Sequence, residues 1–552
     1  MAEPLPPMKW WGWGDPSHPA ELPPHALDFL RAELGVPGER HPPPALEDVE
    51  LPDPAVPRKA APKLALAVGR EWVRDDRLTR VTHAAGKGYP DLVRMRRGDA
   101  TSAPDAVVYP ADAAELRAVL DACASEAVAV VPFGGGTSVV GGVEPLRDGM
   151  AAVVSLDLGR MAKLEGVDER SLTADFGPGL RGPQVEEALA RRRLTLGHFP
   201  QSFEYATVGG WVATRSAGQA STGYGSIEKL VCGLRCVTPN GEIDLPAVPA
   251  TAAGPGIRQL LVGSEGVLGV ITRATLKVRP IPAERRYEGW MFHSFEEGAE
   301  AFRRLAQSGV VPDVARLSDE AETRLSLALT GEGSFKQRAG LRYVRLRGYE
   351  GGCIVVLGFE GDRTGTARRA ALAGKLLDKA GGLSLGAAPG RAWTRGRYDG
   401  PYFRDAVLDH GVMAETLETA HEWSRLMDLY RAVRGAIQGA LESRGTPGLV
   451  MCHISHLYPS GASLYFTFLA PQEPGAELDQ WRAVKVAACD AIAGAGGTIT
   501  HHHAIGRDHA PWMPREIGEV GLAALQAVKL RLDPAGIMNP GKLFPPPEEA
   551  RP

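Results

Sequence analysis

Three adjacent histidines, His501, His502 and His503, are the residues of this chain that most directly suggest chemistry. Near neutral pH an imidazole can accept or donate a proton and can hydrogen-bond an oxyanion. The glycine-rich segment 496–500 precedes them, and we expect it to lead into an extended strand. Neighbouring side chains of a strand point to opposite faces, so three imidazoles could ligate one zinc ion only at a sharp turn. We therefore favour proton transfer and expect no metal, with a zinc site as the alternative.

A second polar group, residues 452–458, contains His453, His456 and Tyr458, and a strand pattern follows it. Alternation over residues 464–468 predicts a strand with Tyr465 and Thr467 on one face and Leu464, Phe466 and Phe468 on the other. The hydroxyl of a tyrosine in such a position usually has only a structural role. The alternative is a proton acceptor beside a cofactor.

An arginine follows an aromatic pair in the segment Tyr402-Phe403-Arg404-Asp405. A guanidinium is suited to bidentate capture of a phosphate or a carboxylate, which makes Arg404 a candidate for substrate binding. An ion pair with Asp405 is the structural alternative. We expect a helix to begin near Glu415 and to continue to Arg444.

A glycine-rich turn follows the apolar run Ala127–Val131, which predicts a short buried strand. Glycines can adopt φ > 0, and the N–H groups of such a turn can point into one concavity that binds a pyrophosphate. An ordinary surface loop is the alternative. The residues of the proposed cradle are Pro132, Phe133, Gly134, Gly135, Gly136, Thr137 and Ser138.

Another glycine pattern, residues 177–182, matches the spacing of a dinucleotide-binding turn. The strand before it, Ser171–Asp175, alternates polar and apolar residues, unlike the buried parallel strand that such a turn follows. We interpret it as a turn that opens a helix over Pro183–Arg191.

The composition is that of an ordinary globular protein, with 552 residues, 44% apolar and 23% charged. A net charge of −4, from 62 basic and 66 acidic residues, predicts no nucleic-acid partner. No apolar run is long enough for a transmembrane helix, and we find no secretory signal. The six cysteines have no disulfide or zinc spacing, so we expect reduced thiols and a cytoplasmic protein.

Segments 207–211, 214–218 and 263–272, in this order after the glycine turn, resemble the FAD-binding fold of the vanillyl-alcohol-oxidase type. The resemblance implies an α+β protein with a two-subdomain FAD-binding fold and an α/β cap domain. No flavin-linking residue stands out, so we expect noncovalent FAD. Beyond the cradle, the resemblance assigns cofactor contacts to Gln201, Ser202, Thr207, Gly210, Thr214, Arg215, Ser216, Ala217, Glu265, Gly266, Val267, Leu268, Gly269, Val270, Ile271 and Arg316.

Four motifs narrow this resemblance to the alkyldihydroxyacetonephosphate synthase family, over the chain from Met8 to Phe544. The motifs are 8–14, 402–405 with 415–419, 464–466, and 501–503. The family resemblance implies that acyl-dihydroxyacetone phosphate forms an adduct at flavin N5 through its C1, loses its fatty acid and receives a fatty alcohol. It also implies that Tyr465 takes the C1 proton, Arg404 holds the phosphate, the three histidines assist proton transfer, and Arg316 lies near the flavin.

The resemblance also leads us to expect a division into an N-terminal wrapping segment (1–101), an FAD-binding domain (102–282), a cap domain (283–500) and a C-terminal return (501–552). We expect a homodimer. Trp10, Trp11 and Trp13 are expected to pack on the core, and peripheral membrane contact is the alternative.

The alternative function is that of an FAD-dependent D-2-hydroxyacid dehydrogenase. The segment Asn539-Pro540-Gly541-Lys542 resembles those dehydrogenases more than it resembles the synthases.

Overall fold

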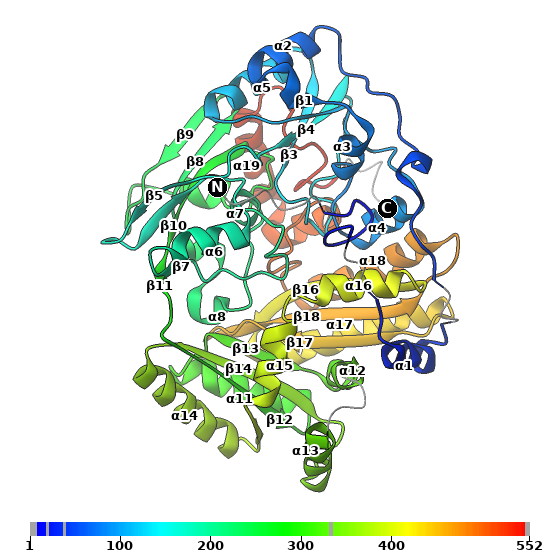
Figure 1. Cartoon of the computed structure of the whole chain (residues 1–552), viewed down its shortest axis with the longest axis vertical. Helices are drawn as coiled ribbons and strands as arrows, with labels where there is room; N and C mark the ends of the chain where they lie inside the picture. The colour runs from blue at the N-terminus through cyan, green and yellow to red at the C-terminus, as the bar shows by residue number, and fades with distance from the viewer. Residues whose placement is uncertain (1–7, 18–20, 37–39, 330–334, 547–552) are drawn as a thin grey trace.

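Two bodies of mixed helix and sheet meet along a broad interface in the computed structural model (Figure 1), which describes residues 8–17, 21–36, 40–329 and 335–546. In the view of Figure 1 the flavin-side body, which holds the predicted cofactor segments, is above and the cap is below. The N-terminal segment runs along both bodies.

Three sheets form the flavin-side body. The first, in which β2, β3 and β4 pair in parallel, has the order β1 (Val73–Arg74), β2 (Ala106–Val108), β4 (Ala152–Asp157) and β3 (Val128–Phe133). The second is antiparallel, in the order β5 (Leu164–Asp168), β6 (Thr173–Phe176), β10 (Val270–Lys277), β8 (Val231–Thr238) and β9 (Gly241–Leu245). The third pairs β11 (Arg279–Pro280) with β7 (Leu194–Thr195).

The helices of this body and of the N-terminal segment are short. They are α1 (Pro24–Leu34), α2 (Ala60–Val68), α3 (Arg77–Thr82), α4 (Tyr89–Arg96), α5 (Ala113–Ser125), α6 (Gly182–Ala190), α7 (Val208–Ala213), α8 (Ser221–Tyr224), α9 (Ile227–Leu230) and α10 (Ile257–Leu261). Two single 3₁₀ turns, η1 (Leu46–Asp48) and η2 (Arg70–Trp72), accompany them. The predicted strand before the glycine turn is confirmed as β3, and residues 177–182 open α6 as interpreted.

A seven-stranded sheet, antiparallel at every pairing, forms the cap. Its order is β15 (Leu383–Gly386), β12 (Glu284–Phe292), β14 (Cys353–Gly361), β13 (Val314–Ser318), β17 (Leu449–Ile454), β18 (Gly461–Pro471) and β16 (Val412–Glu422). The helices of the cap are α11 (Phe295–Gln307), α12 (Glu320–Leu329), α13 (Phe335–Leu346), α14 (Arg363–Lys379), α15 (Ala388–Gly396), α16 (Gly400–Leu408), α17 (Trp423–Ser443) and α18 (Glu477–Ala495). Of these, α11, α14 and α17 pack on the strands of the sheet, and α18 packs on α17.

The prediction of a helix that begins near Glu415 is wrong, because residues 412–422 form strand β16 and the helix α17 begins only at Trp423. Strand β16 pairs with β18 along its whole length, from Val412 opposite Pro471 to Glu422 opposite Gly461. Eleven consecutive pairings and the burial of most of its side chains outweigh the helix propensity of this segment.

The C-terminal return consists of η3 (Ala510–Trp512), α19 (Met513–Leu532) and an extended segment that reaches the flavin-side body. That segment pairs with the edge strand β3, where Val130 N donates to Ile537 O and Asn539 N to Val130 O, both at 2.8 Å. The Asn539 side-chain amide donates to the carbonyls of Gly142 and Glu265. The motif that favoured the dehydrogenase alternative therefore has a structural role here.

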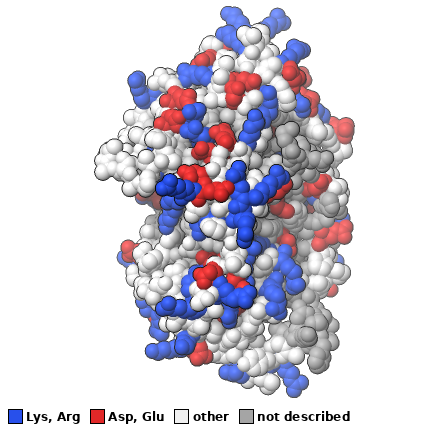
Figure 2. Space-filling model, turned by 60° about the vertical axis from the view of Figure 1, so that its left-hand side comes forward, with Lys and Arg blue, Asp and Glu red and all other residues white. Residues whose placement is uncertain are grey.

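The tryptophan-rich N-terminus packs on the core, as predicted. Trp10 and Trp13 are buried, and Trp13 packs edge-on against Tyr205 with ring centroids 5.4 Å apart. All six cysteines are free and buried. In the described residues we find no helix with the length and apolar character that crossing a bilayer requires. Basic and acidic side chains intersperse on the face drawn in Figure 2.

Candidate functional site

Tyr465 lies in the middle of β18, on the face predicted from the sequence. Its neighbours Leu464 and Phe466 are fully buried, whereas Tyr465 and Thr467 are only partly covered. The ring stacks on His453 of β17, with centroids 4.7 Å apart, and the His503 ring meets it edge-on at 5.3 Å. Burial raises the pKa of Tyr465 to about 12, so the hydroxyl is protonated at neutral pH.

Glu418 of β16 stands opposite Tyr465 and organises the three histidines. Its carboxylate accepts backbone hydrogen bonds from His501, His502 at 2.9 Å and His503 at 2.7 Å, and another from the Thr500 hydroxyl at 2.7 Å. The extended strand expected here is therefore wrong: the segment is a turn wrapped around one buried carboxylate. Because of this turn, the three imidazoles lie next to one another, and those of His502 and His503 are 3.5 and 3.9 Å from the Glu418 carboxylate.

Charge and burial oppose each other at this carboxylate. Burial alone would raise the pKa of Glu418, but the imidazoles of His502, His503 and His501 and the His502 N–H hold it well below its usual value. Burial lowers the pKa of both His501 and His502 to about 4. At pH 7 these two imidazoles are neutral.

The turn also brings His501 and His502 close to His456. Nitrogens of the three residues lie within 4.8 Å of one another, a spacing that a metal ion could bridge after a small adjustment. The nitrogens already have partners, however: His456 Nε2 lies 3.2 Å from the Gly218 carbonyl, and His501 Nδ1 lies 3.0 Å from His502 Nδ1. We therefore keep proton transfer as the favoured role, with metal binding as the alternative.

Arg316 of β13 reaches the same site through His453. Its Nη2 donates to Glu322 Oε1 at 2.6 Å and lies 3.1 Å from His453 Nδ1. Burial would raise the pKa of Glu322, but Arg316 and His453 lower it to about 2. The Arg316–Glu322 pair thus fixes the imidazole on which Tyr465 stacks.

Arg404 of α16 lies where the cap meets the N-terminal segment. Its Nη1 donates to the Lys87 carbonyl at 2.7 Å, and its Nη2 lies 3.2 Å from Asp405, so the structural alternative is present in part. The Nε of Arg404 is buried and has no hydrogen-bond partner among the residues that the structure describes. A buried donor without an acceptor is costly, which favours an anion bound at this guanidinium.

The glycine turn packs against the segment that contains Thr207. A Cβ on Gly134 would lie 2.3 Å from Thr207 Oγ1, and one on Gly135 would lie 2.0 Å from the Tyr205 carbonyl. Gly136 has φ of 63°. Within the described residues, the N–H groups of positions 135–138 donate to no protein backbone acceptor, as expected of an anion cradle.

Other predicted cofactor positions converge on this turn. The N–H of Gly210 donates to Thr207 Oγ1 at the start of α7, and a Cβ on Gly266 would meet the Pro132 ring. Glu265 accepts from the N–H groups of Ile505 and Gly506, so the cradle side and the histidine turn are joined. The Nδ1 of His198 and the Nε1 of Trp211 are buried without partners, which leaves donors and acceptors for a polar cofactor.

Several predicted cofactor residues have side chains engaged elsewhere. Arg215 donates to the carbonyls of Val262 and Gln259, and Gln201 donates to that of Arg397. The Thr214 hydroxyl donates to the Gly210 carbonyl, and the Ser216 hydroxyl lies 3.2 Å from His198 Nε2. At Ser202 the backbone carbonyl, not the side chain, is engaged, because it accepts from the N–H groups of Tyr205 and Ala206. Five further predicted positions have apolar side chains packed in the interior, so only their backbone groups could contact a cofactor: Ala217, Val267, Leu268, Val270 and Ile271. At Gly269, a Cβ would meet the Val237 carbonyl.

Sequence reasoning did not assign Glu418, Glu322 or Tyr458 to the site. Tyr458 places its hydroxyl 2.7 Å from His501 Nε2. Glu418 lies in a strand whose side chains are mostly buried, and the helix interpretation concealed its position opposite Tyr465. His453 and His456 were noted as a cluster but had no assigned role.

Replacing Gly135 by valine is expected to expel FAD. The new side chain would collide with the Tyr205 carbonyl and push apart the two segments that form the cradle. Gly435→Val in α17, where a Cβ would meet no atom within 4 Å, is the matched control. Flavin absorbance per purified chain measures the effect, and a fully yellow Gly135→Val protein would contradict it.

Comparisons with known proteins place this geometry in a family context. The FAD binding domain family matches residues 104–244, and the family of FAD linked oxidases, C-terminal domain, matches residues 281–543. The chain is 37% identical to the alkyldihydroxyacetonephosphate synthase of Trypanosoma brucei brucei, over 98% of this chain and 93% of the relative. The synthase of Dictyostelium discoideum is 33% identical over the same shares.

A solved alkyldihydroxyacetonephosphate synthase superposes with a TM-score of 0.84 at 31% identity, over 97% of this chain and 98% of that chain. The 4-ethylphenol oxidase of Gulosibacter chungangensis, at 16% identity and a TM-score of 0.67 over 91% of this chain and all of its own, shares the fold. A D-lactate dehydrogenase [cytochrome] of Arabidopsis thaliana is more distant, with 25% identity over 81% of this chain and 74% of its own.

Proposed function

Because this chain belongs to the alkyldihydroxyacetonephosphate synthase family, we propose that it exchanges the acyl chain of acyl-dihydroxyacetone phosphate for a fatty alcohol and so forms an ether lipid. The observation that carries the proposal is the turn of His501–His503 around Glu418 beside Tyr465. It gathers neutral proton acceptors and a hydroxyl at one site, which an exchange needs because protons must leave and return.

The cofactor is FAD, in keeping with the match to the FAD binding domain family. The residues that would hold it are the cradle 132–138, with Thr207, Gly210 and Glu265 beside it. The chemistry it would supply is covalent catalysis without net oxidation or reduction. Noncovalent attachment remains our expectation.

Tyr465 has the central role in the proposed proton transfer. With its pKa raised by burial, its hydroxyl must give up its own proton as it takes the proton from C1 of the substrate. The imidazoles of His502 and His503 are the histidine rings of the turn that lie next to it, and we assign them as the acceptors of that proton. The same imidazoles would later accept the hydroxyl proton of the incoming alcohol.

We assign the substrate phosphate to Arg404, whose buried Nε lacks a protein partner. Arg404→Lys keeps the positive charge but loses the planar fork, so the apparent affinity for the phosphorylated substrate should fall. Charge-assisted hydrogen bonds of this kind contribute roughly 1.5–3 kcal/mol, so the KM should rise about ten- to a hundredfold. The exposed Arg363→Lys of α14 serves as the control. An unchanged KM would leave Arg404 with a structural role.

The function itself is tested by anaerobic mixing of the yellow protein with palmitoyl-dihydroxyacetone phosphate and hexadecanol, or with D-lactate. We expect the first mixture to release palmitate and form an ether product. Bleaching of the flavin by D-lactate, with electrons passed to a dye, would instead support the dehydrogenase alternative.

Lipid substrates lead us to propose peripheral membrane contact as well, through α13. This helix projects from the cap in Figure 1, and its Leu346 and Leu341 are 75% and 50% exposed. Arginines flank them at 342, 345 and 347, which suits an anionic bilayer surface. Leu346→Asp should abolish cosedimentation with phosphatidylserine vesicles, whereas Val520→Asp on α19 should not.

The expected homodimer stays a prediction, which analytical sedimentation of the purified protein would test.

A further inference from the structure

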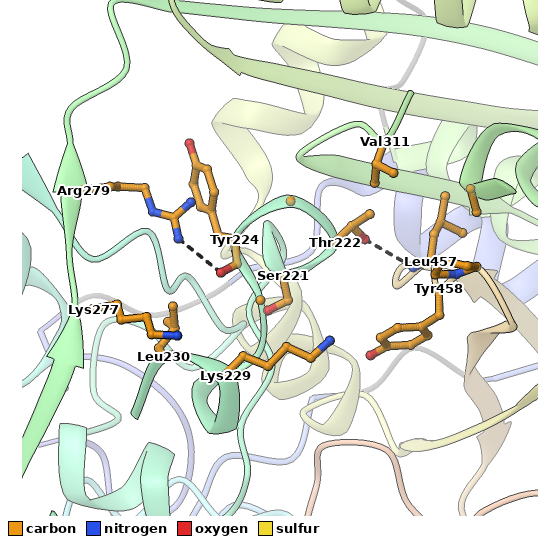
Figure 3. A pocket seen from close by; sticks show the side chains of 14 residues that line it. Ser221, Thr222, Tyr224, Lys229, Leu230, Lys277, Arg279, Val311, Leu457 and Tyr458 are labelled. Carbon is orange, nitrogen blue, oxygen red and sulfur yellow. Dashed lines mark hydrogen bonds between the residues drawn. The ribbon is translucent and has the colours of Figure 1, made fainter. Parts of the chain in front are cut away.

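A cavity of about 380 Å³ lies where the flavin-side body meets the cap, beside the histidine turn (Figure 3). One wall comes from residues 221–225 and 229–230, together with Lys277 and Arg279 on β10 and β11. The opposite wall comes from the cap, through Val311 and residues 457–459. The cavity is thus bounded by both bodies.

The lining of this cavity is cationic. Lys229, Lys277 and Arg279 contribute three positive charges, and no carboxylate lies among its lining residues. Acids outside the lining have other partners: Glu360 accepts from the hydroxyls of Tyr224 and Tyr287, Asp313 pairs with Arg369, and Glu228 lies 3.6 Å from Arg215. Asp313 and Glu360 offset part of the charge of Arg279, but the lining itself contributes no negative charge.

Hydrogen-bond donors in the lining are also incompletely used. Arg279 donates to the Tyr224 carbonyl from Nη2 at 3.2 Å, but its Nε is buried and finds no acceptor within the described part of the chain. The Lys229 ammonium lies 5.4 Å from the Tyr458 ring centroid, a cation–π arrangement that leaves its N–H donors available. A small dianion would satisfy these donors and the charge together.

Tyr458 connects the cavity to the candidate site. Its ring lines the cavity, and its hydroxyl lies 2.7 Å from His501 Nε2. The neighbouring Leu457 N–H donates to Thr222 Oγ1 at 3.3 Å, which joins the two walls. A ligand in the cavity would therefore lie one side chain away from the histidine turn.

We propose that this cavity is a second anion site, which takes the phosphate monoester head group of a substrate or product next to the histidine turn and separately from Arg404. The volume is large enough for a head group of the glycerol phosphate size. The identity of the ligand rests on the proposed function, whereas the anion site rests on the charges of the walls.

The test uses the full-length FAD-loaded protein and lysine acetylation followed by mass spectrometry. Glycerol 3-phosphate should shield Lys229 and Lys277 from acetylation, and should leave the exposed Lys375 of α14 unshielded. Inorganic phosphate should act in the same way at higher concentration. Equal acetylation of Lys229 and Lys277 with and without these anions would overturn the proposal. Stronger shielding by butyrate than by either phosphate would overturn the assignment to a phosphate.

A variant provides an independent measurement. Lys229→Met/Lys277→Met should weaken glycerol 3-phosphate binding at this site by about tenfold or more, measured by calorimetry in an Arg404→Lys background that weakens the other candidate site. Lys375→Met should have no effect. Unchanged binding in the double variant would overturn the proposal. If the anions do not shield the lysines but the enzyme still exchanges acyl for alkyl chains, the anion site is refuted and the proposed function is not. If the anions shield the lysines but no exchange occurs, the proposed function is refuted and the anion site is not.

Discussion

Tyr465→Phe is expected to keep the fold and FAD and to lose exchange of acyl for alkyl chains. The hydroxyl points from a strand whose flanking residues are buried, so its removal leaves the packing of β18 intact. Loss of a positioned proton acceptor typically lowers the rate by about 10²–10⁴-fold. The rate of palmitate release, with flavin absorbance as the check on folding, measures the effect.

The same variant should stop the exchange of solvent deuterium into C1 of acyl-dihydroxyacetone phosphate. Tyr349→Phe, which loses a hydroxyl bonded to the Gly381 carbonyl in the cap, is the control and should exchange normally. Deuterium incorporation at the wild-type rate in Tyr465→Phe would remove the tyrosine from the proton path and assign the base to residues 501–503.

Glu418→Gln is expected to lower the exchange rate by about a hundredfold or more and to destabilise the fold. The carboxylate accepts from three backbone N–H groups and one hydroxyl, whereas a glutamine has one acceptor oxygen and turns an NH₂ group toward the same donors. Hydrogen bonds to a charged group contribute roughly 1.5–3 kcal/mol each, and an unsatisfied buried donor costs about 1–3 kcal/mol.

Thermal unfolding and the exchange rate are measured together for this variant. Glu422→Gln, at the exposed end of the same strand, is the matched control and should behave as wild type. A Glu418→Gln protein with normal stability and normal exchange would show that the histidine turn holds its shape without the carboxylate. Lost stability with normal exchange would make Glu418 purely structural.

Much of the site could be predicted from local patterns. The alternation over 464–468 fixed the face of Tyr465, because a strand has a period of two and its buried residues are large and apolar. The strand and turn at 128–138 were predictable for a similar reason, since three glycines after an apolar run have few alternatives. Family motifs supplied the roles that these patterns alone could not.

The histidine turn could not be predicted in the same way. Its shape depends on Glu418, which lies 83 residues before His501, and local sequence contains no information about such a partner. Segment 412–422 contains residues that favour helices, and only its pairing with β18 makes it a strand. A buried carboxylate at the centre of a backbone turn is a tertiary feature, and the wrong helix assignment hid it.

The pairing of β3 with residues 537–539 has a consequence for the synthesis of the protein. The strand that carries the glycine cradle emerges from the ribosome about 400 residues before the segment that covers its open edge. At about 5–20 residues per second, that edge stays unpaired for tens of seconds. An uncovered edge strand can pair with another chain. The nascent flavin-side body therefore has a period of exposure to misassembly, and stable retention of FAD is expected only after translation ends.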